Sequence, residues 1–246
     1  MSFEINNKVA LVTGANRGIG KAIVESFLQH GATKVYLAVR DVESTNDLVA
    51  LYGEQVETLY MDVSNPESIK AAATMATDVQ VVVNNAGILK PADPLNDDIE
   101  EAFSQELTVN TFGLIRVAKA FVPLLEQNGG GAFVQINSIA SIKNFSGFTS
   151  YSASKAAAYS LTQGLKEQVA DKNIQVLSVH PGPIATDMAD SVGMGEMGEA
   201  TSVVSEGIVT ALAAGEFHLF PDTMAQQFWQ VYQDFSAGIV EAPLGE

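Results

Sequence analysis

The sequence contains no cysteine among its 246 residues. This absence excludes disulfides, thiolate nucleophiles and zinc sites with cysteine ligands. Basic residues are scarce as well: 13 Lys and Arg stand against 29 Asp and Glu, which gives a formal net charge of -16 and a pI of about 4.4. A surface of this charge repels nucleic-acid backbones and anionic lipid headgroups, so we expect no nucleic acid and no membrane as partners.

Long hydrophobic runs are missing too, because no apolar run approaches the about 20 residues that a membrane helix needs. The first residues show no basic segment followed by an apolar one, so we expect a cytoplasmic protein. The three histidines show no metal-ligand spacing, and we assign no metal. With 47% hydrophobic and 17% charged residues and no linker or repeat, residues 1–246 are expected to form a single dinucleotide-binding and catalytic domain.

Short apolar runs alternate with segments of helical periodicity along the whole chain. Strands are expected at 8–13, 34–39, 56–60, 79–83, 132–137, 174–180 and 216–220, and helices at 18–30, after Pro66, and at 97–126, 148–170, 202–214 and 223–237. The run at 79–83 is almost entirely β-branched, which is typical of a strand covered on both faces. These repeated units predict a single-domain α/β fold: a Rossmann-type doubly wound parallel sheet of about seven strands with helices on both faces.

A glycine-rich segment, Thr13–Gly20, links the first strand to the first helix. Its glycines let the backbone turn tightly and approach a pyrophosphate, while the helix N-terminus offers free N–H groups. Such loops also occur as plain turns, but the position after the first strand favours dinucleotide binding. The loop residues expected to bind the cofactor are Gly14, Asn16, Arg17, Gly18, Ile19 and Gly20.

The end of the second strand selects between the two nicotinamide nucleotides. An acid at the strand end would accept from the ribose 2′-OH of NAD. If Val39 ends the strand, that place is apolar, and Arg40 can bind a 2′-phosphate with Arg17 as a second cation. We therefore expect NADP(H). Two alternatives stay open: Arg40 can simply pair with Asp41 on the surface, and a shift of one residue would put Asp41 on the ribose and favour NAD(H).

Two further segments follow predicted strands and are expected to contact the cofactor. Asp62 and Val63 follow the third strand, where the carboxylate can accept from an adenine amino group or simply close a turn. Asn84, Ala86 and Gly87 follow the fourth strand, where small residues let the backbone pass close to a flat ligand. An Asx turn is the alternative for this second segment.

Tyr151 and Lys155 lie four residues apart, and Ser138 lies thirteen residues before Tyr151. Residues four apart share one face of a helix, and an ammonium beside a phenol lowers the phenol pKa. A serine hydroxyl can then hold a substrate carbonyl against the phenol. Each residue alone has an ordinary structural explanation, and so has Asn110 as a helix polar residue. Together, beside a dinucleotide loop, they predict a proton-transfer site.

At this point the chain resembles the short-chain dehydrogenase/reductase family, and among its members an NADP(H)-preferring carbonyl reductase. The motifs that carry the resemblance are TGANRGIG at 13–20, NNAG at 84–87, Asn110, Ser138, YSASK at 151–155 and PGPIAT at 181–186. The resemblance implies that Tyr151 is the general acid or base, and that Lys155 lowers its pKa and binds the nicotinamide ribose. It also implies that Ser138 orients the carbonyl and that Asn110 holds a water of a proton relay.

The same resemblance assigns the segment after the sixth strand. Pro181, Gly182 and Ile184 would pack against the nicotinamide, and Thr186 would contact its carboxamide. A homodimer through helices 97–126 and 148–170 is implied, whereas the C-terminal sequence departs from the usual ending and puts a tetramer in doubt. Residues 188–215 are expected to include a Met- and Gly-rich cover over the substrate, with an ordinary surface loop as the alternative.

The sequence thus predicts an oxidoreductase that transfers hydride between NADP(H) and a small ketone, aldehyde or alcohol. One alternative is an NAD(H)-dependent alcohol dehydrogenase of the same fold. A second is a dinucleotide-binding regulatory protein without catalysis. A sugar-nucleotide epimerase ranks last, because about sixty residues after Thr186 leave little room for a substrate domain. Apart from Lys143, segments 139–150 and 188–197 contain no charged anchor that would identify the substrate as an acid or a phosphate, so the substrate is not identified.

Overall fold

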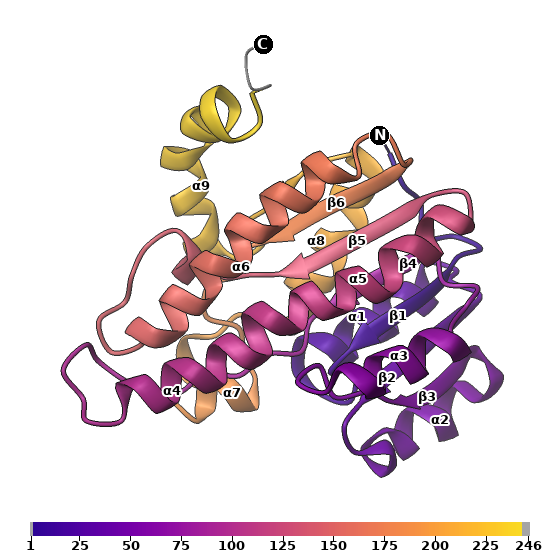
Figure 1. Cartoon of the computed structure of the whole chain (residues 1–246), viewed down its shortest axis with the longest axis horizontal. Helices are drawn as coiled ribbons and strands as arrows, with labels where there is room; N and C mark the ends of the chain where they lie inside the picture. Colours follow the sequence, from indigo (N-terminus) through magenta and orange to yellow (C-terminus); the bar gives the residue numbers. More distant parts are fainter. Residues whose placement is uncertain (1, 243–246) are drawn as a thin grey trace.

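The structure, a computed structural model, describes residues 2–242. Its centre is a parallel sheet of seven strands in the order β3-β2-β1-β4-β5-β6-β7, flanked by helices (Figure 1). The strands are β1 Val9–Thr13, β2 Lys34–Val39, β3 Val56–Tyr60, β4 Val81–Asn84, β5 Gly131–Ile136, β6 Ile174–Val179 and β7 His218–Leu219. Every neighbouring pair runs parallel, which confirms the predicted Rossmann-type fold class.

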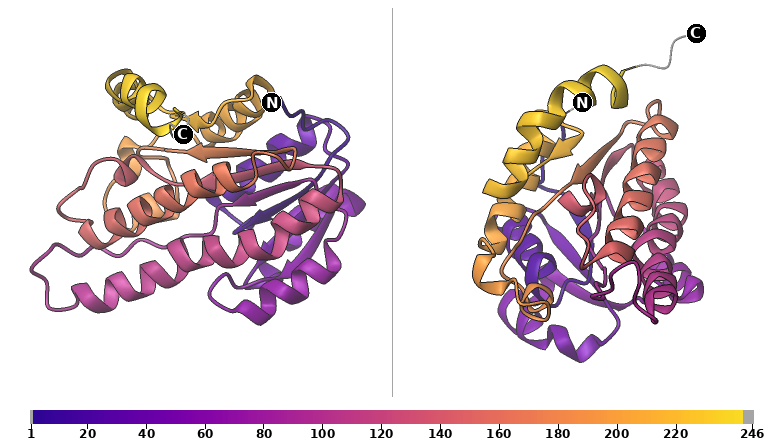
Figure 2. Two further views of the ribbon diagram at one scale, coloured as in Figure 1. Left: turned by 45° about the horizontal axis from the view of Figure 1, so that its top comes forward. Right: turned by 90° about the vertical axis from the view of Figure 1, so that its left-hand side faces the viewer.

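The sheet is covered on both faces. The helices are α1 Gly18–Gln29, α2 Asn46–Tyr52, α3 Pro66–Met75, α4 Ile99–Glu106, α5 Phe112–Gln127, α6 Thr149–Gln168, α7 Asp187–Asp190, α8 Thr201–Ala214 and α9 Thr223–Phe235. One apolar core joins α1 and α8 to the sheet through Ile23, Phe27 and Ile208, and the other joins α3 and α5 through Ile69 and Phe121. The two helix layers lie on opposite sides of the strands in Figure 2.

The strands alternate between these two cores. Ala10 and Val12 of β1 belong to one core and Leu11 to the other, as the two-residue period of a strand requires. Every residue of β4, β5 and β6 is buried, which is why these strands are mostly apolar and do not alternate between apolar and polar residues. Asn65 caps α3 by accepting from the Glu67 N–H at 3.0 Å, and Pro66 begins the helix.

Two helical regions of the structure differ from the helices expected from the sequence. Helix α2 is not expected from the sequence. The region expected as one helix at 97–126 consists of α4, a π-helical turn Leu107–Thr111 and α5, because one inserted residue in a turn leaves little trace in the apolar periodicity. By length and composition alone, the continuous stretch Ile99–Gln127 would suffice to cross a membrane, which the sequence did not lead us to expect. However, Leu114, Val117 and Phe121 pack into a core, as in a helix of a globular domain.

The segment expected to cover the substrate, 188–215, extends into the core of the domain. Residues 201–214 form α8, which packs on α1 with Val204, Ile208 and Leu212 fully buried. This part belongs to the core of the domain and cannot open over a substrate. Only residues 188–200, which hold the end of α7 and a 3₁₀ turn Gly195–Met197, lie outside it.

Candidate active site

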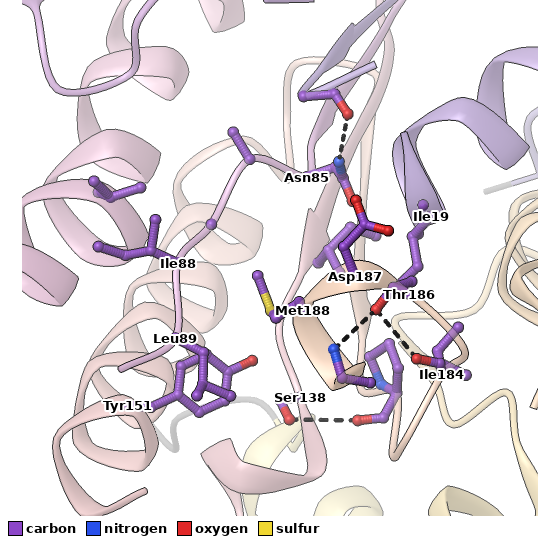
Figure 3. A pocket seen from close by; sticks show the side chains of 18 of the residues that line it. Ile19, Asn85, Ile88, Leu89, Ser138, Tyr151, Ile184, Thr186, Asp187 and Met188 are labelled. Carbon is purple, nitrogen blue, oxygen red and sulfur yellow. Dashed lines mark hydrogen bonds between the residues drawn. The ribbon is translucent and has the colours of Figure 1, made fainter. Parts of the chain in front are cut away.

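A cavity of about 690 Å³ lies at the carboxyl ends of the parallel strands, where ligands bind in sheets of this kind. Its lining comes from the segments that follow β1 through β6. The sequence-predicted residues that line it are Gly14, Asn16, Arg17, Gly18, Ile19, Arg40, Asp62, Val63, Ala86, Gly87, Ser138, Tyr151, Lys155, Pro181, Gly182, Ile184 and Thr186. Figure 3 shows part of this set converging on one space.

The glycine loop has the conformation that its sequence predicts. Gly14 and Gly18 have φ of +64° and +52°, a region that favours glycine. Gly20 lies beneath the loop rather than in the cavity wall, and a Cβ there would stand 2.1 Å from the Gly14 carbonyl oxygen. Arg17 begins α1 without a side-chain cap, so the first N–H groups of the helix remain available to an anionic ligand. These features fit a pyrophosphate.

Asn85, which the sequence did not single out, ties the segment after β4 to the glycine loop. Its Nδ2 donates to the Thr13 carbonyl oxygen at 2.8 Å and to that of Gly14 at 3.3 Å. The N–H groups of Asn85 and Ala86 both donate to Thr13 Oγ1 at 2.9 Å. Asn84 does not line the cavity: its side chain is buried and donates to Gln135 Oε1 at 2.7 Å, within the sheet.

Strand β2 ends at Val39, so Arg40 is the first residue beyond it. Arg40 is exposed and lines the cavity. The Asp41 carboxylate, by contrast, accepts from the Glu43 N–H at 3.1 Å and caps the following 3₁₀ turn. Both residues are exposed and line the cavity, but within residues 2–242 only Asp41 has a hydrogen-bond partner for its side chain.

Asp62 lines the cavity and also closes a turn. Its Oδ1 accepts from the Ser64 N–H at 2.8 Å and from Ser64 Oγ at 2.7 Å. The turn interaction that the sequence left open is therefore present. Val63 beside it packs in the core under Gly113, whose Cβ would stand 3.2 Å from Val63 Cβ.

The three proton-transfer candidates come from two neighbouring segments. Ser138 follows β5, its Oγ donates to the Pro181 carbonyl oxygen at 3.4 Å, and it accepts from the Ala140 N–H at 3.1 Å. Tyr151 and Lys155 lie one turn apart on α6. The Lys155 Nζ donates to the Ile136 carbonyl oxygen at 2.9 Å and lies 5.8 Å from the centre of the Tyr151 ring. Tyr151 and Ser138 lie at the same end of the cavity in Figure 3.

The pKa of Tyr151 differs from the expectation. Burial raises this pKa to about 12, the Ser138 hydroxyl opposes the shift, and the Glu106 carboxylate adds to it. Burial also lowers the pKa of Lys155 to about 8, and Glu106 opposes that shift. Removal of the phenol from water is the largest of these effects on the Tyr151 pKa. The phenol is protonated at neutral pH, which is the form that a general acid requires.

Asn110 lies in the π-helical turn and holds the segment that enters the cavity after Gly87. Its Oδ1 accepts from the Ile88 N–H at 2.9 Å, and its Nδ2 donates to the Ile88 carbonyl oxygen at 2.9 Å and to Ser154 Oγ at 3.0 Å. A Cβ on Gly87 would stand 3.2 Å from Asn110 Oδ1 and 3.6 Å from Lys155 Nζ. Asn110 and Lys155 therefore meet at Gly87, and the asparagine amide is fully engaged.

Glu106 is a buried acid of this site that the sequence reading missed. Its side chain is 0% exposed, its Oε1 accepts from the Lys90 N–H at 2.7 Å, and its Oε2 has no hydrogen-bond partner among the described residues. Burial raises its pKa. Its position one turn before Asn110 on the same helix face was the available signal.

The buried carboxylate of Asp222 holds the segment after β6. The Asp222 carboxylate, 1% exposed, accepts from the Gly182 N–H at 2.6 Å and from the Ala225 N–H at 3.0 Å, so it links this segment to α9.

His180 is fully buried between two hydroxyls: its Nδ1 lies 2.9 Å from Ser141 Oγ and its Nε2 lies 2.8 Å from Ser178 Oγ. Burial lowers the pKa of His180 to about 3. It is a neutral, packed side chain, as the sequence suggested.

Comparisons with known proteins agree with this geometry. Residues 8–196 match the family model described as short chain dehydrogenase. A 3-oxoacyl-(acyl-carrier-protein) reductase of Vibrio cholerae is 34% identical over 194 residues, which are 77% of this chain and 79% of that protein. The 7alpha-hydroxysteroid dehydrogenase of Escherichia coli is 32% identical over 200 residues, covering 78% and 76% of the two chains.

Solved structures give the same result. A short chain dehydrogenase from Burkholderia cenocepacia, in complex with NADP, has a TM-score of 0.87 and 34% identity and covers 98% of this chain and 100% of its own. A second one, from Burkholderia phymatum in complex with NAD, shares the fold with a TM-score of 0.84 at 22% identity, covering 99% and 100%. The chain therefore belongs to the short-chain dehydrogenase/reductase family of oxidoreductases.

Proposed function

We propose that the protein transfers hydride between NADP(H) and a carbonyl or alcohol substrate, with Tyr151 as general acid in reduction and general base in oxidation. The observation that carries the proposal is the position of Tyr151, Ser138 and Lys155 at one end of the cavity whose other end is formed by the glycine loop. The nucleotide supplies the hydride chemistry, and the chain supplies position and one proton.

Side chains of the protein orient the substrate and transfer the proton. In reduction the Ser138 and Tyr151 hydroxyls donate to the substrate oxygen, so negative charge that develops there as the C=O π bond breaks is stabilised. The Tyr151 proton then moves to that oxygen and completes the alcohol. The pKa of Tyr151, about 12, keeps the phenol protonated until that moment. Lys155, one turn away, would return a proton to the phenolate.

NADP(H), rather than NAD(H), is supported by the Arg40 guanidinium at the end of β2, which forms no ion pair with any residue from 2 to 242. Arg40 stands where a 2′-phosphate would be read, while Asp41 is engaged in a cap. The Burkholderia cenocepacia relative was solved with NADP, which agrees with this choice. NAD(H) stays the alternative cofactor.

The test is NADPH oxidation with a panel of neutral ketones and aldehydes. We expect Tyr151→Phe to abolish turnover and to keep NADPH binding, because the hydroxyl that donates the proton is lost and the ring remains. Tyr60→Phe is the matched control, since Tyr60 is 54% exposed on β3 and lies outside the cavity. Full turnover by Tyr151→Phe would refute the mechanism. Tight NADPH binding with no turnover of any carbonyl compound by the unmodified protein would favour the regulatory alternative.

Three further expectations belong to this proposal. A homodimer would form through α4, α5 and α6, which is supported by Phe112 and Leu161, apolar side chains that are 47% and 38% exposed on these helices. Residues 188–200 would cover the substrate, since Met188 and Met194 line the cavity. The protein would act in the cytoplasm.

A further inference from the structure

The cavity has two chemically different ends. The segments after β1, β2 and β3 form the end with the glycine loop, and those after β5 and β6 form the end with Ser138 and Tyr151. Around Tyr151 the wall is apolar and comes from four segments. Its main side chains are Leu89, Phe145, Phe148, Met188, Met194 and Met224.

Each charged side chain that lines the cavity either lies at the glycine-loop end or is engaged by another group of the protein. Arg40, Asp41 and Asp62 follow β2 and β3, on the far side of the sheet from β5 and β6. Arg17 pairs with Asp187 at 2.9 Å, so the two charges cancel. Among the described lining residues, only Lys155 remains.

Lys155 does not serve as an anchor for a substrate anion. It is 4% exposed, and its Nζ donates to the Ile136 carbonyl oxygen at 2.9 Å. The buried Glu106 carboxylate raises the pKa of Lys155 and so favours its charged form. Among the described side chains at this end of the cavity, the hydroxyls of Ser138 and Tyr151 are the groups placed to donate to a substrate oxygen. Two donors suffice for the two lone pairs of one carbonyl oxygen and leave nothing for a carboxylate or phosphate.

We infer that the site accepts neutral carbonyl compounds with apolar substituents and rejects substrates that carry a carboxylate or phosphate beside the reacting carbonyl. A buried anion without a cation loses its hydration uncompensated. The formal net charge of -16 acts in the same direction by repelling anions from the protein. Flexible methionines from two segments of the lining suit apolar groups of varied shape. This inference rests on the proposed reductase function.

A matched pair of ketones tests the inference: methyl benzoylformate, which is neutral, and benzoylformate, which is its carboxylate. The two share the ring and the reacting carbonyl; the ester adds a methyl group, removes the charge and is the more electrophilic ketone, so their ratio is compared with the ratio of their rates of reduction by borohydride. With NADPH, we expect kcat/KM for the ester to exceed that for the acid by about 100-fold or more. Equal values would overturn the inference and leave the reductase function standing. If neither compound nor any other neutral ketone is reduced, the proposed function itself fails.

Variants locate the discrimination within the cavity. Met194→Lys places a cation in the apolar wall, so we expect kcat/KM for benzoylformate to rise about 10-fold or more and that for the ester to fall. Met197→Lys makes the same charge change three residues away, on a side chain that is 63% exposed and outside the lining. Equal gains from the two variants would show that overall charge, not the wall, selects the substrate. If Met194→Lys does not fold, the ester-to-acid ratio of the unmodified protein still decides.

Discussion

Arg17 Nη1 and Asp187 Oδ2 lie 2.9 Å apart and join the glycine loop to the start of α7 across the cavity. Asp187 is drawn beside Thr186 and Ile19 in Figure 3. Both side chains are about 70% exposed, at 68% and 70%, so the pair stabilises the fold by at most about 1 kcal/mol. Its importance is local, because the same guanidinium is a candidate ligand of the cofactor phosphates.

Asp187→Asn should therefore strengthen the binding of NADPH. The substitution frees Arg17 and removes a negative charge from the cavity, so we expect the Kd for NADPH to fall about 2- to 5-fold, the size of an exposed ion pair. Asp190→Asn removes the same charge from the same short helix outside the lining and should change little. Fluorescence titration of both variants provides the measurement, and a weaker Kd for Asp187→Asn would contradict the competition.

Arg40→Ala should weaken NADPH far more than NADH. Loss of a charge-assisted contact to a 2′-phosphate costs about 1.5–3 kcal/mol, which is about 10- to 150-fold in Kd, and NADH lacks this phosphate. The two cofactors serve as each other's control. An equal loss for both would show that Arg40 does not read the 2′-phosphate and would favour NAD(H).

Gly20→Ala should destabilise the domain and impair nucleotide binding. The added Cβ would stand 2.1 Å from the Gly14 carbonyl oxygen, so the glycine loop would have to shift, at about 1–3 kcal/mol. Gly164→Ala is the matched control: it lies inside α6 with nothing within 4 Å, and it should stabilise by about 0.5–1 kcal/mol. Urea unfolding of both variants measures the two effects, and equal stabilities would contradict the packing argument.

Much of this fold was accessible from the sequence because its strands are buried on both faces. Runs such as Gly131–Ile136 are mostly apolar, and each is followed by the polar or glycine residues of a loop. The carboxyl ends of parallel strands meet at one edge, so Ser138 and the glycine loop had to lie at the same edge. These two facts predicted both the architecture and the place of the site.

The features that could not be predicted from the sequence depend on contacts between segments that lie far apart in the chain. Adjacent asparagines have different roles, since Asn84 turns into the sheet and Asn85 ties two loops together. The charge of Glu106 near Lys155, and the Asp222 contact that holds Gly182, join segments far apart in the chain. The pKa of Tyr151 is raised because the phenol is buried, and the spacing of residues along the chain does not reveal burial.

Glu106→Gln should separate the charge of this buried acid from its hydrogen bond. The amide oxygen can still accept from the Lys90 N–H, but the carboxylate charge that raises the pKa of Lys155 and of Tyr151 is gone. The pKa of Lys155, about 8, should therefore fall, and so should that of Tyr151 from about 12. We expect the alkaline limb of the pH profile of kcat/KM to move to lower pH. Glu100→Gln, an exposed position of α4, should leave the profile unchanged.

The same variant has a defined effect on stability. Burial raises the pKa of Glu106 above its ordinary value of 4.5, so the folded state binds its proton more tightly than the unfolded chain does. The stability from the protonated form is fully present below that ordinary value and is lost as the pH rises through the folded pKa. Glu106→Gln should thus match the unmodified protein in Tm at acidic pH and exceed it at neutral pH. If the variant changes Tm but not the pH profile, Glu106 only stabilises the fold. If its charge acts on Lys155 and Tyr151, the alkaline limb of the profile has to move.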